Sequence, residues 1–252
     1  MSKPSFDRDS APQTLKALLA LRERILAGAL QPGERISELS AVQQLGVSRT
    51  PVRAALARLA GEGLLEPLPS GGYAVRAFGA ADIFDAIEVR GVLEGAAARM
   101  AAERGVSVGR LAPLKDCAAT LDDLVRRADL GADGFSEYVR LNARFHALLV
   151  DMAASPALER LVERATASPF ASPSAFVMAQ SALPESRAIL TIAQEHHRSV
   201  VDAIQNREGT RAEAVMREHS RLAHRNLQLA LRNRDSLALV PGAALIRGGA
   251  NV

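Results

Sequence analysis

All five histidines of the chain lie beyond residue 145, and three of them have a spacing that suits a metal site. Asn142 and His146 are four residues apart, so a helix would place them on one face. His197 lies twelve residues before Gly209, and His219 lies ten residues after it. In a helical hairpin that turns at Gly209, the two imidazoles would stand roughly level, about 18 and about 15 Å from the turn.

Three imidazoles and one amide oxygen can therefore meet inside a bundle of helices. Imidazole binds zinc, nickel, copper and iron, and the oxygen donor widens the choice. We predict a divalent metal at these four residues, with zinc or nickel favoured. A histidine taken alone is more often a hydrogen-bonded structural residue, and that interpretation stays open for each of them. We adopt it for His196 and His224. A helix would turn His196 about 100° from His197, and it would turn His224 about 140° from His219.

The residues around Arg49 and Arg53 suit contacts with nucleic acid. These arginines are four residues apart near the start of an expected helix, with Ser48 as its N-cap and Thr50 beside them. Arginine pairs bidentately with guanine, and hydroxyl groups at a helix N-terminus can bind phosphates. On residue types alone, the alternative is an ordinary surface helix with solvated arginines. The opposite face of this helix is apolar and suits a small core: Val52, Ala55, Leu56 and Leu59.

The net charge of +3 lies entirely in the first third of the chain. Residues 1–78 contain ten Lys/Arg and seven Asp/Glu, whereas residues 79–252 contain twenty-one of each. The stretch between Glu38 and Glu62 has three arginines and no acidic residue. A positive segment on an otherwise neutral chain indicates an anionic partner for the N-terminal part.

Hydrophobic periodicity, capping residues and turn residues predict three helices followed by two short strands in residues 13–78. The strands surround a turn at Pro69-Ser70-Gly71-Gly72. This is the element order of a winged helix-turn-helix, whose recognition helix enters the major groove of DNA. The expected helices are Gln13–Ala27, a short one from Ser37 to Leu45, and one from Ser48 to Gly61; the strands are Leu64–Leu68 and Tyr73–Phe78.

After Phe78 the pattern changes to long helices rich in Ala, Leu and Arg, with no convincing strand. We predict an all-helical bundle over residues 79–234, a loose arm at residues 1–12 and a patternless tail at residues 235–252. The expected fold class is therefore mainly α: a winged helix-turn-helix followed by a helical bundle. The bundle helices are expected at Ala80–Arg104, Ser107–Leu130, Gly134–Ala153, Pro156–Ala167, Ser172–Ala182, Pro184–Asn206 and Thr210–Arg234.

Composition excludes several classes of protein. Aromatic residues make up only 4%, which argues against a protein that stacks single-stranded bases on aromatic rings. The single cysteine, Cys117, excludes an intrachain disulfide framework and a cysteine-based zinc module, and it fits a reducing compartment. No run of 18 apolar residues occurs, so we expect no membrane span and a cytoplasmic protein.

One run of residues is long enough to be a family signature. It reads Leu45-Gly46-Val47-Ser48-Arg49-Thr50-Pro51-Val52-Arg53, followed by Ala55-Leu56, Leu59 and Glu62-Gly63-Leu64. With Pro32-Gly33-Glu34-Arg35 ahead of it, this run resembles the N-terminal domain of GntR-family bacterial transcriptional regulators over about residues 15–78.

That resemblance implies double-stranded DNA as the partner. It implies that Arg49, Thr50 and Arg53 contact the DNA, and that the wing tip at Gly71 and Gly72 enters the minor groove. The wing of this chain lacks the arginine pair that is common before the glycine in the family.

Shorter motifs follow in the second part of the chain. They are Arg90 with Leu93-Glu94, Asn142-x-x-Phe145-His146, Glu195-His196-His197-Arg198 and Met216-x-x-His219. These motifs resemble the helical effector-binding domain of the FadR-type GntR subfamily, usually called FCD, over about residues 80–230.

The second resemblance implies a ligand set and an effector contact. Metal-binding members use an acidic or amide residue and three histidines, which here are Asn142, His146, His197 and His219, with Asn142 in place of the commoner Asp. The resemblance also implies that Arg90 points into the pocket and pairs with the carboxylate of a small organic acid. The alternative for this arginine is a structural role, as a surface ion pair with the glutamate four residues later. An acyl-CoA effector is disfavoured, because relatives that bind it lack these histidines.

The leading hypothesis is a DNA-binding transcriptional regulator, most often a repressor in this family, that binds a pseudo-palindromic operator as a homodimer. A small organic acid bound in the metal-containing helical domain would change its operator affinity. Two alternatives stay open. A metal-dependent hydrolase would use the histidines to activate water, with Glu195 as the nearest carboxylate in sequence. An architectural DNA binder would use the helical domain only to dimerise, without metal or effector.

Overall fold

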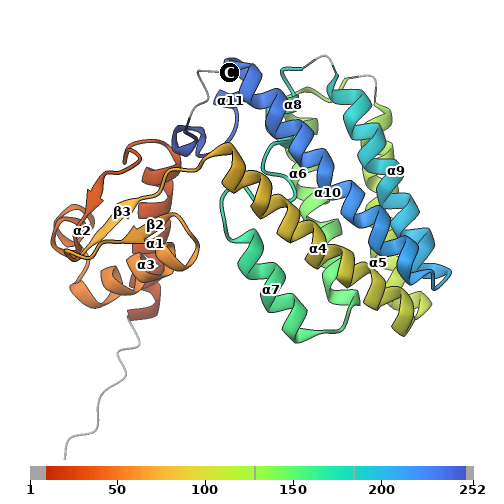
Figure 1. Ribbon diagram of the computed structural model, residues 1–252, viewed down its shortest axis with the longest axis horizontal. Helices are drawn as coiled ribbons and strands as arrows, with labels where there is room; N and C mark the ends of the chain where they lie inside the picture. Colours follow the sequence, from red (N-terminus) through yellow and green to blue (C-terminus); the bar gives the residue numbers. More distant parts are fainter. Residues whose placement is uncertain (1–9, 128, 184, 248–252) are drawn as a thin grey trace, which may run out of the picture. The chain divides into compact units, whose positions relative to one another are not determined.

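The computed structural model describes residues 10–247 except residues 128 and 184. The described chain forms two compact units (Figure 1). One contains the chain up to Gly79 together with Pro241–Arg247, and the other contains Ala80–Val240. The predicted fold class is confirmed: a winged helix-turn-helix with a small sheet precedes a helical bundle. In the part of the chain that the structure describes, no helix has the length and apolar character that crossing a membrane requires.

The first unit contains three helices and a three-stranded sheet. The sheet is antiparallel with the order β1-β3-β2, and it pairs Arg35 with Ala74 and Leu65 with Val75. The strand β1 was not expected from the sequence, because two residues are too few to show an alternating pattern. Its Ile36 is nevertheless buried. The elements are α1 (Ser10–Leu26), β1 (Arg35–Ile36), α2 (Glu38–Leu45), α3 (Arg49–Gly61), β2 (Leu65–Pro67) and β3 (Tyr73–Val75).

The turn between α2 and α3 follows from its residues. The Ser37 hydroxyl accepts a hydrogen bond from the backbone N–H of Ser40, which caps α2. Gly46 ends that helix with φ 63°, in the left-handed region that glycine adopts without steric cost. The predicted apolar face of α3 is confirmed, since Val52, Ala55 and Leu56 are fully buried together with Leu59.

The second unit consists of long helices with irregular connections. Its elements are α4 (Ala80–Arg104), α5 (Val108–Arg126), α6 (Gly131–Met152), α7 (Pro156–Thr166), α8 (Val177–Gln180), α9 (Ser186–Gln205), α10 (Gly209–Arg232) and α11 (Arg234–Ala238). The predicted helix at Ser172–Ala182 is wrong over most of its length: residues 172–176 form turns, and only Val177–Gln180 is helical. Pro169 and Pro173 lack an N–H group, and the neighbouring Ser168, Ser172 and Ser174 can compete for backbone hydrogen bonds.

Helices α4 and α10 pack closely against each other (Figure 1). A Cβ atom on Gly91 would lie 2.1 Å from Ser220 Oγ, and one on Gly95 would lie 2.7 Å from Arg217 Cγ. Glycine at both positions therefore allows an approach that any larger residue would prevent. The consequence is that α4 and α10 lie close together along their contact in the helical unit.

The ends of the chain differ from the expected arm and tail. Residues 10–12 of the predicted arm belong to α1, and the rest of it lies outside the described residues. In the predicted tail, α11 is followed by a short 3-10 helix, Ala243–Leu245, whose Leu245 is fully buried. The backbone of Phe78 exchanges hydrogen bonds with Leu245 and Arg247 at 2.8 Å each. The segment was missed because a few apolar residues carry no periodicity.

Candidate functional site

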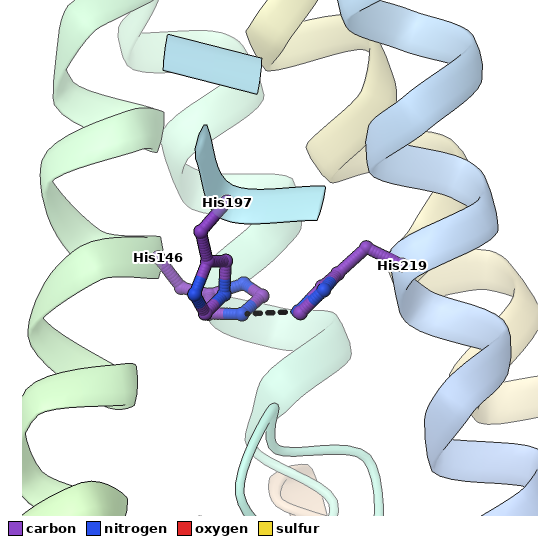
Figure 2. A group of neighbouring side chains, drawn as sticks. All are labelled: His146, His197 and His219. Atoms are coloured by element: carbon purple, nitrogen blue, oxygen red, sulfur yellow. Dashed lines mark hydrogen bonds between the residues drawn. The ribbon is translucent and has the colours of Figure 1, made fainter. Parts of the chain in front are cut away.

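Three histidines from three helices meet in the core of the helical unit, as their spacing predicted (Figure 2). His146 comes from α6, His197 from α9 and His219 from α10. One ring nitrogen of each lies within 4.8 Å of the others, and all three side chains are buried. The expected turn of the hairpin near Gly209 is present, because α9 ends at Gln205 and α10 begins at Gly209.

Two of the three rings are oriented by buried polar side chains. His146 Nδ1 lies 2.8 Å from Glu94 Oε1, and His197 Nδ1 lies 3.0 Å from Gln194 Oε1. A carboxylate only accepts, and the Gln194 amide nitrogen donates elsewhere, to Ala118 O at 2.8 Å. Both Nδ1 atoms must therefore carry the proton. The Nε2 atoms are left as lone pairs, which is the state that a metal ligand needs.

The distance between two of the ring nitrogens fits a divalent metal. His146 Nε2 and His219 Nε2 are 3.3 Å apart, and Figure 2 shows these atoms facing each other. Nitrogen–zinc bonds of about 2.0–2.1 Å in a tetrahedral site imply a nitrogen–nitrogen separation of about 3.3–3.4 Å. The Nε2 atom of His197 is buried and has no hydrogen-bond partner among the described residues. A buried imidazole nitrogen without a partner is costly in a protein core, and a metal ion would satisfy it.

The electrostatics of the cluster favour neutral rings at His197 and His219 beside one ionised carboxylate. Burial is the main cause that holds the pKa of His197 and of His219 well below the usual histidine range. Burial alone would raise the pKa of Glu94, but the interactions of its carboxylate with His146 and Arg90 outweigh burial and lower that pKa. Neutral rings bind metals, and an ionised Glu94 compensates part of the cation's charge.

Asn142, the fourth predicted ligand, is buried on α6 one turn before His146. Its Nδ2 donates to Ser174 Oγ at 3.0 Å, and that hydroxyl donates in turn to Val139 O. The amide oxygen of Asn142 is therefore the end that remains available as an acceptor. Among the hydrogen bonds of the described residues, none joins Asn142 to an imidazole.

Arg90 is buried on α4 beside the cluster. It forms an ion pair with Glu94, which was the alternative to an effector contact. Its Nε lies 3.4 Å from Glu94 Oε2, and its Nη1 donates to Ala171 O at 2.9 Å. The pair differs from the expected surface contact, because both side chains are only 1% exposed. A guanidinium has five N–H donors, so these two contacts leave others for a ligand.

Two cavities adjoin these residues. Arg90, Asn142 and His219 line a small cavity of about 30 Å³, together with Gln180 and Asn226. The amide oxygens of Gln180 and Asn226 are buried and have no hydrogen-bond partner among the described residues. A larger groove of about 370 Å³ runs along α6 and α7, with Glu94 and His146 among its lining residues.

Sequence reasoning missed Glu94 and Gln194 as members of this site. Glu94 appeared only as the partner of Arg90, four residues earlier. Gln194 lies three residues before His197, a helical spacing that could have indicated its contact. Of the other two histidines, His224 lies apart from the cluster, with its ring 3.0 Å from Phe84 O. The His196 ring packs edge-on against the His219 ring at 6.0 Å between centroids, but it is not one of the three histidines whose ring nitrogens converge.

The predicted DNA-contacting residues lie at the exposed start of α3. Ser48, Arg49 and Thr50 are exposed, and Ser48 occupies the N-cap position without making the expected side-chain cap. The Ser48 hydroxyl therefore makes no capping hydrogen bond to the backbone of α3. Arg53 is also exposed, but its guanidinium is paired with Glu38 of α2, a contact that the sequence pattern did not predict.

The wing turn has the predicted glycines at its tip. Gly71 and Gly72 have φ values of 84° and 80°, and a Cβ atom on Gly72 would lie 3.0 Å from the backbone oxygen of Ile36. The backbone oxygens of Ser70 and Gly71 accept hydrogen bonds from Arg35 Nη2 at 3.1 and 2.8 Å. Arg35 therefore stabilises the wing turn through these two hydrogen bonds.

Comparison with known families decides the assignment. The FCD domain profile matches residues 85–222, and the profile for bacterial regulatory proteins of the gntR family matches residues 13–75. The chain belongs to the GntR family, in its FCD subfamily. The relatives of this GntR/FCD regulator are transcriptional regulators and not enzymes, which disfavours the hydrolase alternative.

Two curated relatives and one solved structure illustrate the match. The GntR/FCD regulator is 35% identical to the Nta operon transcriptional regulator of Aminobacter aminovorans over 132 residues, which are 52% of this chain and 60% of that protein. It is 30% identical over 200 residues, 77% of this chain and 80% of the other, to the "Probable D-xylose utilization operon transcriptional repressor" of Paenarthrobacter nicotinovorans. The E. coli McbR/YncC structure shares the fold, with TM-score 0.56 and 21% identity over 85% of this chain and 98% of that one.

Proposed function

We propose that this GntR/FCD regulator is a homodimeric repressor that binds a pseudo-palindromic operator and responds to a small organic acid. The acid binds in the helical unit beside a divalent metal and changes the affinity for DNA. The observation that carries the proposal is the buried triad of imidazoles, with rings oriented by Glu94 and Gln194. A relative described as an operon repressor supports the sign of the regulation. A regulator of chromosomal genes works in the cytoplasm, where we place it.

The metal site consists of His146, His197 and His219, with the amide oxygen of Asn142 as the fourth ligand. Zinc or nickel suits three imidazoles and one oxygen. When bound, the cation supplies positive charge and coordination positions for an oxygen donor of the acid. A neutral amide binds a cation less strongly than a carboxylate does, so we expect weaker occupancy than in relatives with Asp at this position.

The acid binds at Arg90, which pairs with its carboxylate, and the cavity there of about 30 Å³ has to widen to admit it. Guanidinium binds a carboxylate through two parallel hydrogen bonds, and a buried arginine has already lost its water. The partnerless amide oxygens of Gln180 and Asn226 line the same cavity and suit further polar groups of the ligand. Because Arg90 and Glu94 both lie on α4, the acid and the metal act on one helix. That helix begins at Ala80, directly after the DNA-binding unit in the chain.

Replacing Arg90 by Lys should weaken the acid response and leave operator binding intact. Lysine keeps the charge beside Glu94 but cannot make two parallel bonds, so we expect acid affinity to fall at least about tenfold. The acid is first identified by thermal shift among acetate, succinate, malate and citrate. The measurement is then the acid concentration that half-changes operator binding in a mobility-shift assay.

Arg99→Lys is the matched control, because Arg99 lies on the same helix but is exposed and paired with Glu213. Circular dichroism checks that both variants fold. An Arg90→Lys variant that is folded and responds with the wild-type midpoint would remove Arg90 from the acid site. A response that shifts equally in the Arg99→Lys variant would show that the effect is not local to the cavity.

The homodimer is held by the helical unit. One winged helix reads only a few base pairs, and two-fold pairing doubles the contacts. The α4 residues Val89 and Val92 lie three apart and are 54% and 42% exposed, which provides an apolar contact face.

Light scattering at micromolar concentration should therefore give twice the chain mass. Val89→Glu should raise the dimer dissociation constant at least about tenfold, because it buries a charge in an apolar contact. Leu161→Glu on α7, which is equally exposed at 50%, should leave the dimer intact. A monomeric mass for the wild-type protein would contradict the dimer, and equal effects of both variants would contradict the α4 face.

A further inference from the structure

Arg53 on α3 is held by a carboxylate from the preceding helix. Its Nε donates to Glu38 Oε1 at 2.8 Å, and its Nη2 donates to Glu38 Oε2 at 3.0 Å. Two parallel hydrogen bonds fix the plane of a guanidinium, which a single contact would leave free to rotate. The two residues are 15 positions apart and lie on opposite sides of the turn between α2 and α3.

The carboxylate is itself attached to a rigid position. Glu38 is the first residue of α2, directly after the Ser37 cap, whose hydroxyl holds the N–H of Ser40 at 3.0 Å. The Ser40 hydroxyl donates back to the Ser37 carbonyl, also at 3.0 Å. The first turn of α2 is thus fixed by side chains as well as by its backbone, so Glu38 supports Arg53 from a fixed base.

Glu38 leaves one edge of the Arg53 guanidinium for DNA. The bonds to Glu38 use the edge formed by Nε and Nη2, and among the described residues no other hydrogen bond of Arg53 is present. A bidentate contact with guanine O6 and N7 needs two N–H groups on one edge. The edge formed by Nη1 and Nη2 still offers them. Glu38 therefore limits Arg53 to one way of meeting a base.

The negative charge of Glu38 affects the affinity for DNA of any sequence. Its hydrogen bond with Arg53 is the main cause that lowers the pKa of Glu38, so the carboxylate stays ionised at neutral pH. A carboxylate at a DNA-facing surface repels phosphates and offsets part of the attraction of Arg53. That penalty is the same for specific and random DNA, whereas the aimed guanidinium favours only DNA with guanine at the right place.

We infer that Glu38 is a specificity-determining residue, which positions Arg53 for one base and weakens binding to DNA that lacks that base. This inference rests on the proposed function, in which α3 reads the operator. Glu38 does not touch DNA in this role. It acts through Arg53 by reducing the conformational freedom that the arginine would lose on binding.

The test compares Glu38→Gln with Glu23→Gln, which removes the same charge from an exposed position on α1. Operator duplexes are selected from random DNA with the wild-type protein, and dissociation constants are measured for the selected duplex and for a random duplex of equal length. Glu38→Gln should tighten binding to random DNA severalfold and lower the ratio of specific to random affinity about tenfold. Glu23→Gln should leave that ratio within about twofold.

A second comparison separates positioning from a merely structural role. In an Arg53→Ala background, Glu38→Gln should no longer change the affinity ratio, because the side chain that it positions is gone. The inference is overturned if Glu38→Gln keeps the wild-type ratio, or if it lowers the ratio equally in both backgrounds. If Arg49→Ala and Arg53→Ala leave operator binding unchanged, the proposed role of α3 fails first, and that outcome is distinguishable from a failure of Glu38 alone.

Discussion

Arg49→Ala and Arg53→Ala should each weaken specific operator binding by about 1–3 kcal/mol, which is about 5- to 150-fold. Both side chains lie on the exposed start of α3, where the N-terminal residues of a recognition helix meet base edges. The measurement is a mobility-shift titration of a selected operator at matched salt concentration. Arg49→Lys should keep the salt dependence and lose affinity for the operator, because lysine retains the charge without the bidentate fork.

Arg58→Ala is the matched control for these variants. Arg58 lies at the far end of the same helix and is paired with Glu62, so we expect its loss to change specific binding by no more than about threefold. Wild-type affinity for both Arg49→Ala and Arg53→Ala would show that α3 is not the reading helix. An Arg58→Ala variant as weak as the other two would point to a general charge effect.

Removing His146 and His219 together should abolish stoichiometric metal binding. Their Nε2 atoms face each other at 3.3 Å, and without them only His197 and the neutral Asn142 would remain as ligands. One imidazole and one amide oxygen cannot hold a first-row divalent ion at micromolar concentration against water, because structural sites use four ligands. The measurement is metal content per chain after dialysis, by mass spectrometry, for the double alanine variant and the wild type.

His224→Ala is the control for metal content. Its ring lies 3.0 Å from Phe84 O and 4.9 Å, centroid to centroid, from the Phe84 ring, apart from the triad. We expect this variant to keep wild-type metal content. Equal metal in the wild type and in the double variant would show that the buried histidines are structural.

The chain's helical hairpin shows how much the sequence could predict. The level placement of His197 and His219 needed only the break at Gly209 and the rise of a helix. The buried face of α3 needed only the helical period of Val52, Ala55 and Leu56. Such features depend on the geometry of one helix or one hairpin, so residue spacing determines them.

The contacts that orient the site could not be predicted in the same way. Glu94 on α4 reaches His146 on α6 across 52 positions, while Gly91 and Gly95 permit the close approach of α10 to α4. A glycine in a helical pattern does not say which helix will approach it. Likewise, Glu38 meets Arg53 only because the turn at Gly46 sets the angle between two helices. Tertiary packing decides both contacts, and a single sequence holds no period that reports it.

The decisive measurement compares the response of operator binding to an acid with and without bound metal. Wild-type protein is prepared loaded with zinc or nickel and, in parallel, stripped by a chelator and dialysed. The acid found by thermal shift is then titrated into each form bound to the same operator duplex. We expect the acid to change operator affinity in the loaded form and this change to be lost in the stripped form. An identical acid response in both forms would contradict the metal-containing effector site.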